Sequence, residues 1–329
     1  MSQIQKIELD EVELRAAVER LLGERFRRGV EVASLKREAS PFSTLFPADV
    51  LSLELRNGGT MSLFLKHLGS EQSDHPEKQC REREIRIYQN LFSENGLPVP
   101  KYYGSRRNEV TGRHELFLEY VDDWNLKYQD LEHWFATARS LAQLHGYFST
   151  RAETLLRCDF LLRFDAVYFH DWANRALAAV ADQSADLAAR LEPIVHRYDR
   201  IARTLDGQAP TLVHNDLSPK NVLVDRSARP PRIFFVDWEM AGVGCGVLDL
   251  VHLKYGLGRQ DEERMCAAYC GELAGMDFLP SGPTDLKRLL AAAELHKTLY
   301  RLAHSLEWEL PIETVARWVS DAGELFEQV

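Results

Sequence analysis

The chain has 329 residues, which exceeds the size at which a single hydrophobic core usually stops growing, so two lobes are expected. Its apolar content of 45% and charged content of 27% are typical of a globular protein and exclude a largely disordered chain. The formal net charge of −10 argues against nucleic acid as a main partner and suits a cationic partner better.

The N-terminal residues, MSQIQKIELDEVELRAAVERLL, carry charges throughout. Leu14, Val18, Leu21 and Leu22 recur at helical spacing, which predicts an amphipathic helix rather than a signal peptide or a membrane span. The cysteines are scattered, odd in number and without zinc-site spacing: Cys80, Cys158, Cys245, Cys266 and Cys270. We therefore expect reduced thiols, a cytoplasmic location and no membrane partner.

Periodic patterns divide much of the chain into predicted elements. Residues 61–66, 99–104 and 114–121 predict strands, and residues 77–92 and 130–149 predict amphipathic helices. Two further helical patterns lie within residues 160–203. Residues 1–121 are therefore expected to form one lobe and residues 122–329 a second, mainly helical lobe.

The most informative segment is residues 212–239, LVHNDLSPKNVLVDRSARPPRIFFVDWE. Residues 222–225 and 233–236 are short and apolar and flank a run of turn-forming residues, which predicts a β-hairpin. A hairpin returns its chain to where it began. Asn221, before the first strand, and Asp237, after the second, are therefore expected to lie close together.

The side chains of this segment suit a metal–nucleotide site. Asn221 and Asp237 offer hard oxygen ligands, and Mg²⁺ usually takes one or two of these from a protein and the rest from phosphate and water. We therefore expect both residues to bind Mg²⁺. Asp216 lies in the loop just before them and is left to face a substrate hydroxyl.

The order His-x-Asp-(x)4-Asn, then a strand pair, then Asp-Trp-Glu resembles the catalytic core of the aminoglycoside phosphotransferase and choline kinase family. Protein kinases carry the same parts as His-Arg-Asp, Asn and Asp-Phe-Gly. Asn215 and Trp238 replace the Arg and the Phe here, as in the small-molecule kinases. The resemblance implies an α+β, bilobal protein-kinase-like fold, with a small mixed N-terminal sheet lobe that binds nucleotide (residues 1–121) and a larger, mainly helical, catalytic and substrate-binding C-terminal lobe (residues 122–329).

The resemblance also implies an activity. It is transfer of the γ-phosphoryl group of ATP, with Mg²⁺, to a hydroxyl of a small molecule, with Asp216 as the catalytic residue. Lys66 matches the family's strand lysine that steadies the nucleotide phosphates. Glu84, rather than Glu82, matches the helix glutamate that pairs with this lysine.

Two other nucleotide contacts follow from the resemblance. The backbone of Glu119, Tyr120 and Val121 matches the hinge that hydrogen-bonds the adenine edge. The glycine-rich loop that covers the phosphates in protein kinases has no counterpart, because residues 36–50 contain no glycine. We expect Ser43, with its neighbours Ser40 and Thr44, to offer hydroxyl groups to the phosphates instead.

Asp249 follows a glycine-rich turn and begins a predicted helix within residues 242–253. One interpretation is that its carboxylate hydrogen-bonds the backbone of the catalytic loop and holds the loop in shape, as the resemblance implies. The other is an ordinary acid at a helix N-terminus, where the helix dipole favours it. Both interpretations stay open at the level of sequence.

The acceptor is the least determined part of the prediction. Acidic and aromatic residues gather in residues 119–134 and 294–313 and can bind an amine through charge or cation–π contact, although solvated helix faces and core aromatics explain them as well. The acceptor can be an aminoglycoside, an amino alcohol, a sugar or a natural product, because the fold does not choose among them. The sequence also does not decide between ATP and GTP, and it does not give the oligomeric state.

Two other functions are disfavoured. A nucleotide-binding pseudokinase or scaffold would have no chemical reason to keep Lys66, Asp216, Asn221 and Asp237 together. A kinase acting on protein or peptide would need an activation segment, and the sequence shows no recognisable segment ending in Ala-Pro-Glu.

Overall fold

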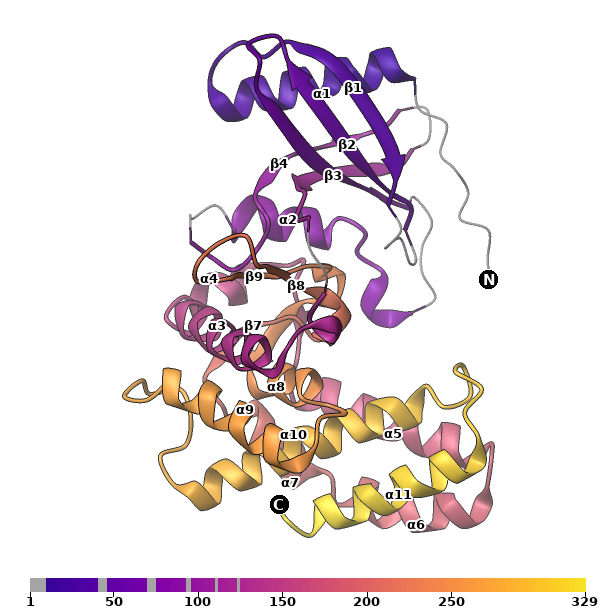
Figure 1. Ribbon diagram of the computed structural model, residues 1–329. Coiled ribbons are helices and arrows are strands. Elements are labelled where there is room, and N and C mark those ends of the chain that lie inside the picture. The colour runs from indigo at the N-terminus through magenta and orange to yellow at the C-terminus, as the bar shows by residue number, and fades with distance from the viewer. Residues whose placement is uncertain (1–9, 41–45, 70–74, 93–95, 110–111, 123–124) are drawn as a thin grey trace. The chain divides into compact units, whose positions relative to one another are not determined.

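The structure is a computed structural model that describes residues 10–40, 46–69, 75–92, 96–109, 112–122 and 125–329. The chain forms two compact units (Figure 1). The first contains Met1–Trp124 and Leu223–Glu239, and the second contains Asn125–Val222 and Met240–Val329. The predicted lobe boundary after residue 121 stays a prediction, and the hairpin residues group with the first unit.

The first unit is built on a five-stranded sheet whose strand order is β1-β2-β3-β5-β4, with antiparallel pairing throughout. Its elements are α1 (Glu11–Phe26), β1 (Val32–Ala39), β2 (Ala48–Leu55), β3 (Thr60–Leu68), η1 (Pro76–Lys78), α2 (Arg83–Asn90), β4 (Tyr102–Arg107) and β5 (His114–Glu119). Consecutive strands joined by short connections favour antiparallel neighbours.

Helix α1 covers one face of this sheet (Figure 1). The predicted stripe of leucines and valine on α1 is buried against Leu51, Leu63 and Phe117 of the strands. Asp10 caps the helix by accepting hydrogen bonds from the backbone N–H groups of the first turn. Gly104 of β4 is required by close approach, because a Cβ there would lie 2.5 Å from Leu21.

A row of alternating charges crosses the sheet, with one residue from each strand. Arg37 lies 2.8 Å from Asp49, and Asp49 lies 2.8 Å from His67. His67 lies 3.7 Å from Glu115, which lies 2.5 Å from Arg106. Sequence patterning does not reveal this row, because its members are far apart along the chain and meet only through the strand register.

The helix predicted over residues 77–92 is shorter than expected. The structure has η1 there and then α2 from Arg83. The intervening residues leave the helix because Arg83 donates to the backbone carbonyls of Glu77 and Glu239, and Lys78 pairs with the Glu239 carboxylate at 2.6 Å. The apolar positions were predicted correctly, since Ile85, Tyr88, Leu91 and Phe92 are all buried.

The predicted hairpin is present as β8 (Val222–Asp225) and β9 (Arg232–Phe235), which form a two-stranded sheet. Arg232 pairs with Asp225 at 2.8 Å near the turn. After β9 the chain enters η4 (Trp238–Met240), where the Trp238 ring is fully buried and meets Phe92 edge-on at 4.9 Å. This packing fixes the residues that follow the hairpin.

The second unit is mainly helical and contains a small sheet in the order β6-β10-β7. Its elements are η2 (Leu126–Tyr128), α3 (Leu131–Ser149), α4 (Ala152–Arg157), β6 (Leu162–Arg163), α5 (Ala166–Ala181), α6 (Ala185–His196), α7 (Asp199–Asp206), β7 (Pro210–Val213), η3 (Pro219–Asn221), β10 (Gly242–Cys245), α8 (Val247–Leu253), α9 (Arg259–Glu272), α10 (Pro283–Ala303) and α11 (Ile312–Phe326). The predicted helix over residues 130–149 is thus confirmed as α3.

Two local predictions in this unit were wrong. Residues 160–203 form three helices rather than two, because Ser184 caps a new helix and the buried Tyr198 separates the next. The expected glycine-rich turn at residues 242–245 is strand β10, which pairs with β7 antiparallel and with β6 parallel. Glycine is needed at Gly246, where a Cβ would lie 2.6 Å from the His145 ring.

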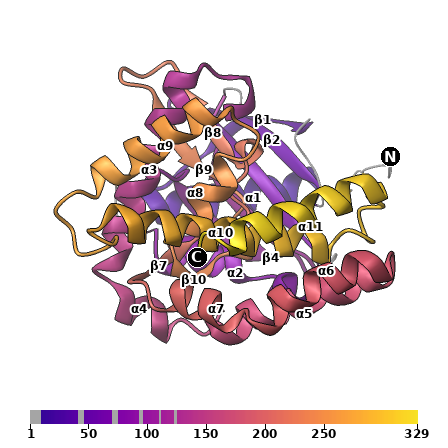
Figure 2. The same cartoon turned by 90° about the horizontal axis from the view of Figure 1, so that it is seen from below.

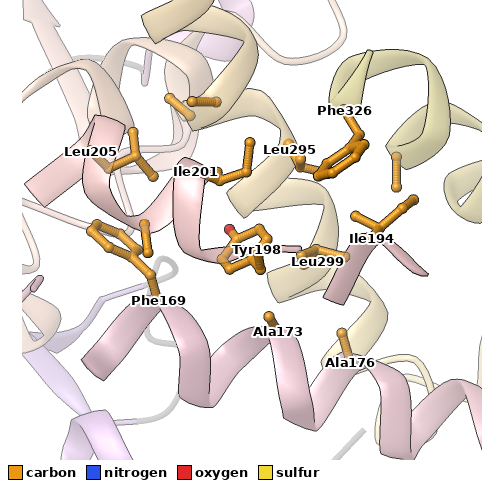
Figure 3. Close-up of a cluster of buried hydrophobic side chains, with 14 of the residues drawn as sticks. Phe169, Ala173, Ala176, Ile194, Tyr198, Ile201, Leu205, Leu295, Leu299 and Phe326 are labelled. Carbon is orange, nitrogen blue, oxygen red and sulfur yellow. The ribbon is translucent and has the colours of Figure 1, made fainter. Parts of the chain in front are cut away.

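The core of the second unit lies among its long helices. Figure 2 shows α10 and α11 alongside α5 and α6. In Figure 3, Phe169, Ala173 and Ala176 of α5 face Tyr198 and Leu299. Across the described residues, no helix combines the length and the apolar character that crossing a membrane requires.

Candidate active site

The loop that carries Asp216 is held by the carboxylate of Asp249. Asp249, near the start of α8, is only 1% exposed and accepts the backbone N–H of His214 at 2.7 Å and that of Asn215 at 2.8 Å. Burial raises the pKa of the Asp249 carboxyl. The hydrogen bond with His145 and the nearby His214 lower this pKa by more, so the net pKa is below the usual value. The interpretation of Asp249 as a brace for the loop is thus confirmed.

Asp216 and Asn221 lie together within this loop. The side-chain nitrogen of Asn221 donates to the backbone oxygen of Asp216 at 2.8 Å and to its carboxylate at 3.1 Å. The Asp216 side chain is 27% exposed, and Lys220 lies 3.5 Å from its carboxylate. Because the nitrogen end of the Asn221 amide is used inside the loop, its oxygen is the end suited to a cation.

In the first unit, Lys66 forms the predicted ion pair with Glu84. The Lys66 ammonium lies 2.7 Å from Glu84 and 2.5 Å from Asp237. Burial lowers the pKa of Lys66, but the carboxylates of Asp237, Glu84 and Glu239 outweigh burial and raise it, so the ammonium stays charged. Glu84 also accepts the backbone N–H of Trp238 at 3.3 Å, which ties α2 to the residue after Asp237.

Asn215 and Asp237 both adopt left-handed backbone conformations, with φ of 66° and 71°. Such conformations are uncommon for residues other than glycine and cost on the order of 1–3 kcal/mol. They persist where surrounding contacts over-determine the backbone, which is typical of active sites. One of these residues immediately precedes the candidate base, and the other is a candidate metal ligand.

The predicted adenine-binding backbone is partly used within the protein. The N–H of Glu119 donates to the carbonyl of Lys101 at 2.8 Å, and the N–H of Tyr120 donates to the carbonyl of Ser62 at 3.4 Å. The N–H groups of Glu119 and Tyr120 are therefore already used within the protein. The sequence prediction could not show this use, because it depends on strand pairing.

The predicted phosphate-binding hydroxyl groups are less well placed by the structure. Ser43 and Thr44 lie outside the described residues. Ser40 is only 4% exposed, and its N–H donates to the carbonyl of Ala48 at 2.8 Å, which continues the pairing of β1 with β2. Ser40 is therefore a poor phosphate ligand, and the role of Ser43 stays a prediction.

The sequence prediction missed two residues that contact the catalytic loop. Lys297 of α10 donates to the backbone oxygen and to the side-chain oxygen of Asn215, at 3.0 and 2.8 Å. Tyr168 of α5 accepts a hydrogen bond from the Asn215 amide at 3.4 Å. The only sequence signal was that Lys297 stands among the apolar residues of the second half of α10, which indicates a buried charge but names no partner.

Among the residues that the structure describes, the side chains do not form a complete metal cage. In the described ranges, no three His, Cys, Asp or Glu side chains gather in a way that could hold a metal ion. A hard cation such as Mg²⁺ does not need such a cage when phosphate and water complete its ligand shell. The oxygen donors of Asn221 and Asp237 are of the type that this mode of binding requires.

The fold is that of the protein-kinase-like enzymes, as three solved structures with TM-scores above 0.5 show. Plasmodium vivax ethanolamine kinase has 14% identity and a TM-score of 0.57, with 90% of this chain and 84% of that chain covered. Aminoglycoside phosphotransferase from Alicyclobacillus acidocaldarius has 15% identity and a TM-score of 0.55, with 98% of this chain and 94% of that chain covered. Macrolide 2'-phosphotransferase from Brachybacterium faecium has 18% identity and a TM-score of 0.53, with 93% of this chain and 98% of that chain covered.

The family model of the phosphotransferase enzyme family matches residues 50–279, which is more than half of the chain. The protein therefore belongs to this family and is an enzyme, a kinase. No curated protein matches its sequence.

Proposed function

We propose that this enzyme transfers the γ-phosphoryl group of ATP to a hydroxyl group of a small molecule. The observation that carries the proposal is the partly exposed carboxylate of Asp216, which Asn221 holds in a loop braced by Asp249. A carboxylate fixed in this way can orient a hydroxyl group and accept its proton. In phosphoryl transfer, with its loose transition state, such positioning matters more than basicity.

The other residues have supporting roles in this proposal. Asn221 and Asp237 would hold Mg²⁺ through their side-chain oxygens, and the ion would supply positive charge to neutralise the phosphates. Lys66 binds phosphate oxygens and is kept in place by Glu84 at 2.7 Å. Phosphate oxygens would replace Asp237 as partners of Lys66, which would leave the Asp237 carboxylate for the metal.

The nucleotide is proposed to bind through the backbone of Glu119 to Val121 and through Ser43. Neither contact depends on a particular nucleobase, so these contacts do not decide whether the enzyme uses ATP or GTP. We also propose a cytoplasmic location without nucleic-acid or membrane partners. The net charge of −10 and the five free cysteines support this proposal.

The acceptor is proposed to be a small hydroxyl compound, of the aminoglycoside, amino alcohol, sugar or natural-product type. The structural neighbours named as ethanolamine kinase and aminoglycoside phosphotransferase support the amine-bearing types. A succession of rings also leads away from Asn215: its members, each within 6.4 Å of the next between centroids, are Tyr168, Trp172, Tyr300, His304 and Trp308.

An exposed ring of this succession can bind a cationic group through cation–π contact, whereas Trp172 and His304 are buried, at 4% and 7% exposed. Arg175 already lies 5.1 Å from the Trp172 ring, and Lys297 lies 5.4 Å from the Tyr300 ring. The outer end, where Trp308 is 46% exposed beside Glu307, is therefore the part that best suits an amine. This argument supports a cationic acceptor and does not name one.

The proposal is tested by ADP release with ATP and Mg²⁺ across aminoglycosides, choline, ethanolamine, amino sugars, macrolides and neutral polyols. We expect one acceptor class to stimulate release, and Asp216→Asn to lower that stimulated rate by at least about 100-fold. Asp206→Asn, an exposed carboxylate at the end of α7, is the matched control and should keep the wild-type rate. Equal rates for wild type and Asp216→Asn would overturn the assignment of Asp216. ATP binding without release in any reaction would favour a scaffold.

A further inference from the structure

Lys297 is a buried lysine whose ammonium is directed at the catalytic loop. It lies on α10, is only 3% exposed, and donates to both oxygen atoms of Asn215. Burying an ammonium is costly unless hydrogen bonds compensate it. The two charge-assisted bonds to Asn215 provide part of that compensation and are of the stronger kind.

Asn215 is consequently held by three helices. Its N–H donates to Asp249 of α8, its two oxygen atoms accept from Lys297 of α10, and its side-chain nitrogen donates to Tyr168 of α5. The backbone N–H, the two oxygen atoms and the side-chain nitrogen of this residue thus all have partners, which come from three helices of the second unit. These contacts explain why the left-handed conformation, with φ of 66°, is maintained at a residue other than glycine.

The pairing of Lys297 with Asn215 also explains why asparagine stands between the His and the Asp of the motif. Protein kinases place an arginine between the motif's His and Asp. An arginine at position 215 would carry a second cation to the buried ammonium of Lys297 and could not accept its hydrogen bonds. Asparagine supplies an acceptor oxygen at the same position, and the chain has Asn215 there.

We propose that Lys297 is a positioning residue for phosphoryl transfer: by fixing Asn215, it fixes the direction in which the neighbouring Asp216 carboxylate leaves the loop. This role rests on the proposed function of Asp216. The helix that carries Lys297 lies beyond residues 50–279, the segment matched to the family.

The first test compares Lys297→Met with Lys254→Met. Lys254 is a matched control because it is also buried, at 6% exposed, and makes ion pairs with Glu262 at 2.7 Å and Glu294 at 2.6 Å. For Lys297→Met we expect kcat for the best acceptor to fall about 100-fold, while the Kd for Mg-ATP changes less than about threefold. For Lys254→Met we expect kcat within about threefold of wild type. Equal losses of kcat in the two variants would overturn the proposal.

A second pair of variants approaches the contact from the loop, in case Lys297→Met does not fold. Asn215→Asp keeps an acceptor oxygen for Lys297, whereas Asn215→Leu removes it with little change in size. We expect Asn215→Asp to keep at least about ten times the kcat of Asn215→Leu. Similar kcat values for the two variants would show that the hydrogen bond to Lys297 has no part in positioning.

Hydrogen exchange separates failure of this inference from failure of the proposed function, because it needs no acceptor. The amides of His214 and Asn215 donate to Asp249 and should exchange slowly in the wild type. In Lys297→Met we expect both amides to exchange at least about tenfold faster, with no such change in Lys254→Met. Unchanged exchange in Lys297→Met would contradict the inference even if the wild type transfers phosphate to no acceptor tested.

Discussion

At the scale of single residues, the candidate site depends on charges that are individually unfavourable in their surroundings. Lys66 is 11% exposed at its side chain and Glu84 is 2% exposed, so neither is well solvated. Each is stabilised by the other, and Asp237 adds a second carboxylate to the ammonium. Removing one member of such a group leaves an uncompensated charge, so a loss of activity by itself would not show a catalytic role.

Lys66→Met and the double variant Lys66→Met/Glu84→Gln separate these two effects. We expect Lys66→Met to lower the free energy of unfolding by about 3–5 kcal/mol, because it leaves the Glu84 carboxylate buried without its cation. Neutralising Glu84 as well should restore most of the stability. Urea denaturation measures the stability, and ADP release measures the activity.

Activity should not follow stability in this series. If Lys66 binds phosphate oxygens, kcat/KM for ATP stays at least about 100-fold below wild type in both variants. A double variant that recovers turnover together with stability would show that Lys66 is only a structural partner of Glu84.

At the scale of elements, the row of charges across the five-stranded sheet couples stability to pH. Burial lowers the pKa of His67, but the hydrogen bond with Asp49 and the nearby carboxylate of Glu115 raise it by more, so the folded value lies above the ordinary 6.5. A raised pKa means that the folded state binds the proton more tightly. The resulting stabilisation is full below pH 6.5 and is lost as pH rises through the folded pKa.

We therefore expect the free energy of unfolding to decline as pH is raised from 6 to 9, and expect His67→Phe to remove much of that decline. His196→Gln is the matched control, because its side chain is 70% exposed at the end of α6. Urea denaturation at several pH values measures the dependence. A slope in His67→Phe equal to the wild-type slope would mean that the row does not hold a proton on His67.

Some of these elements could be predicted from the sequence, and others could not. The hairpin and α3 follow from local periodicity and turn residues, and the pairing of Lys66 with Glu84 follows from a recognisable motif. The path of residues 77–82 could not be predicted, because it depends on Lys78 and Arg83 reaching Glu239, more than 150 residues away along the chain. The charge row has the same cause, since its members meet only through strand register.

At the scale of the whole molecule, the family and the fold are established, while the acceptor is a proposal that rests partly on residues outside the segment matched to the family. The family model ends at residue 279, before α10 and α11. Helix α10 supplies both Lys297, which contacts the catalytic loop, and Tyr300, which belongs to the succession of rings. Similarity to relatives is thus a better guide to the reaction than to the compound phosphorylated.

The central claim is that Asp216 directs transfer of phosphate to a small acceptor, and product analysis tests it most directly. Wild type, Asp216→Asn and Asp206→Asn would each be incubated with ATP, Mg²⁺ and the acceptor that best stimulates ADP release. ³¹P NMR and mass spectrometry would then identify the products. We predict a phosphomonoester of the acceptor, formed in equal amount with ADP by wild type and Asp206→Asn and at least about 100-fold more slowly by Asp216→Asn. ADP formed with inorganic phosphate and no phosphorylated acceptor, or an unchanged rate in Asp216→Asn, would contradict the claim.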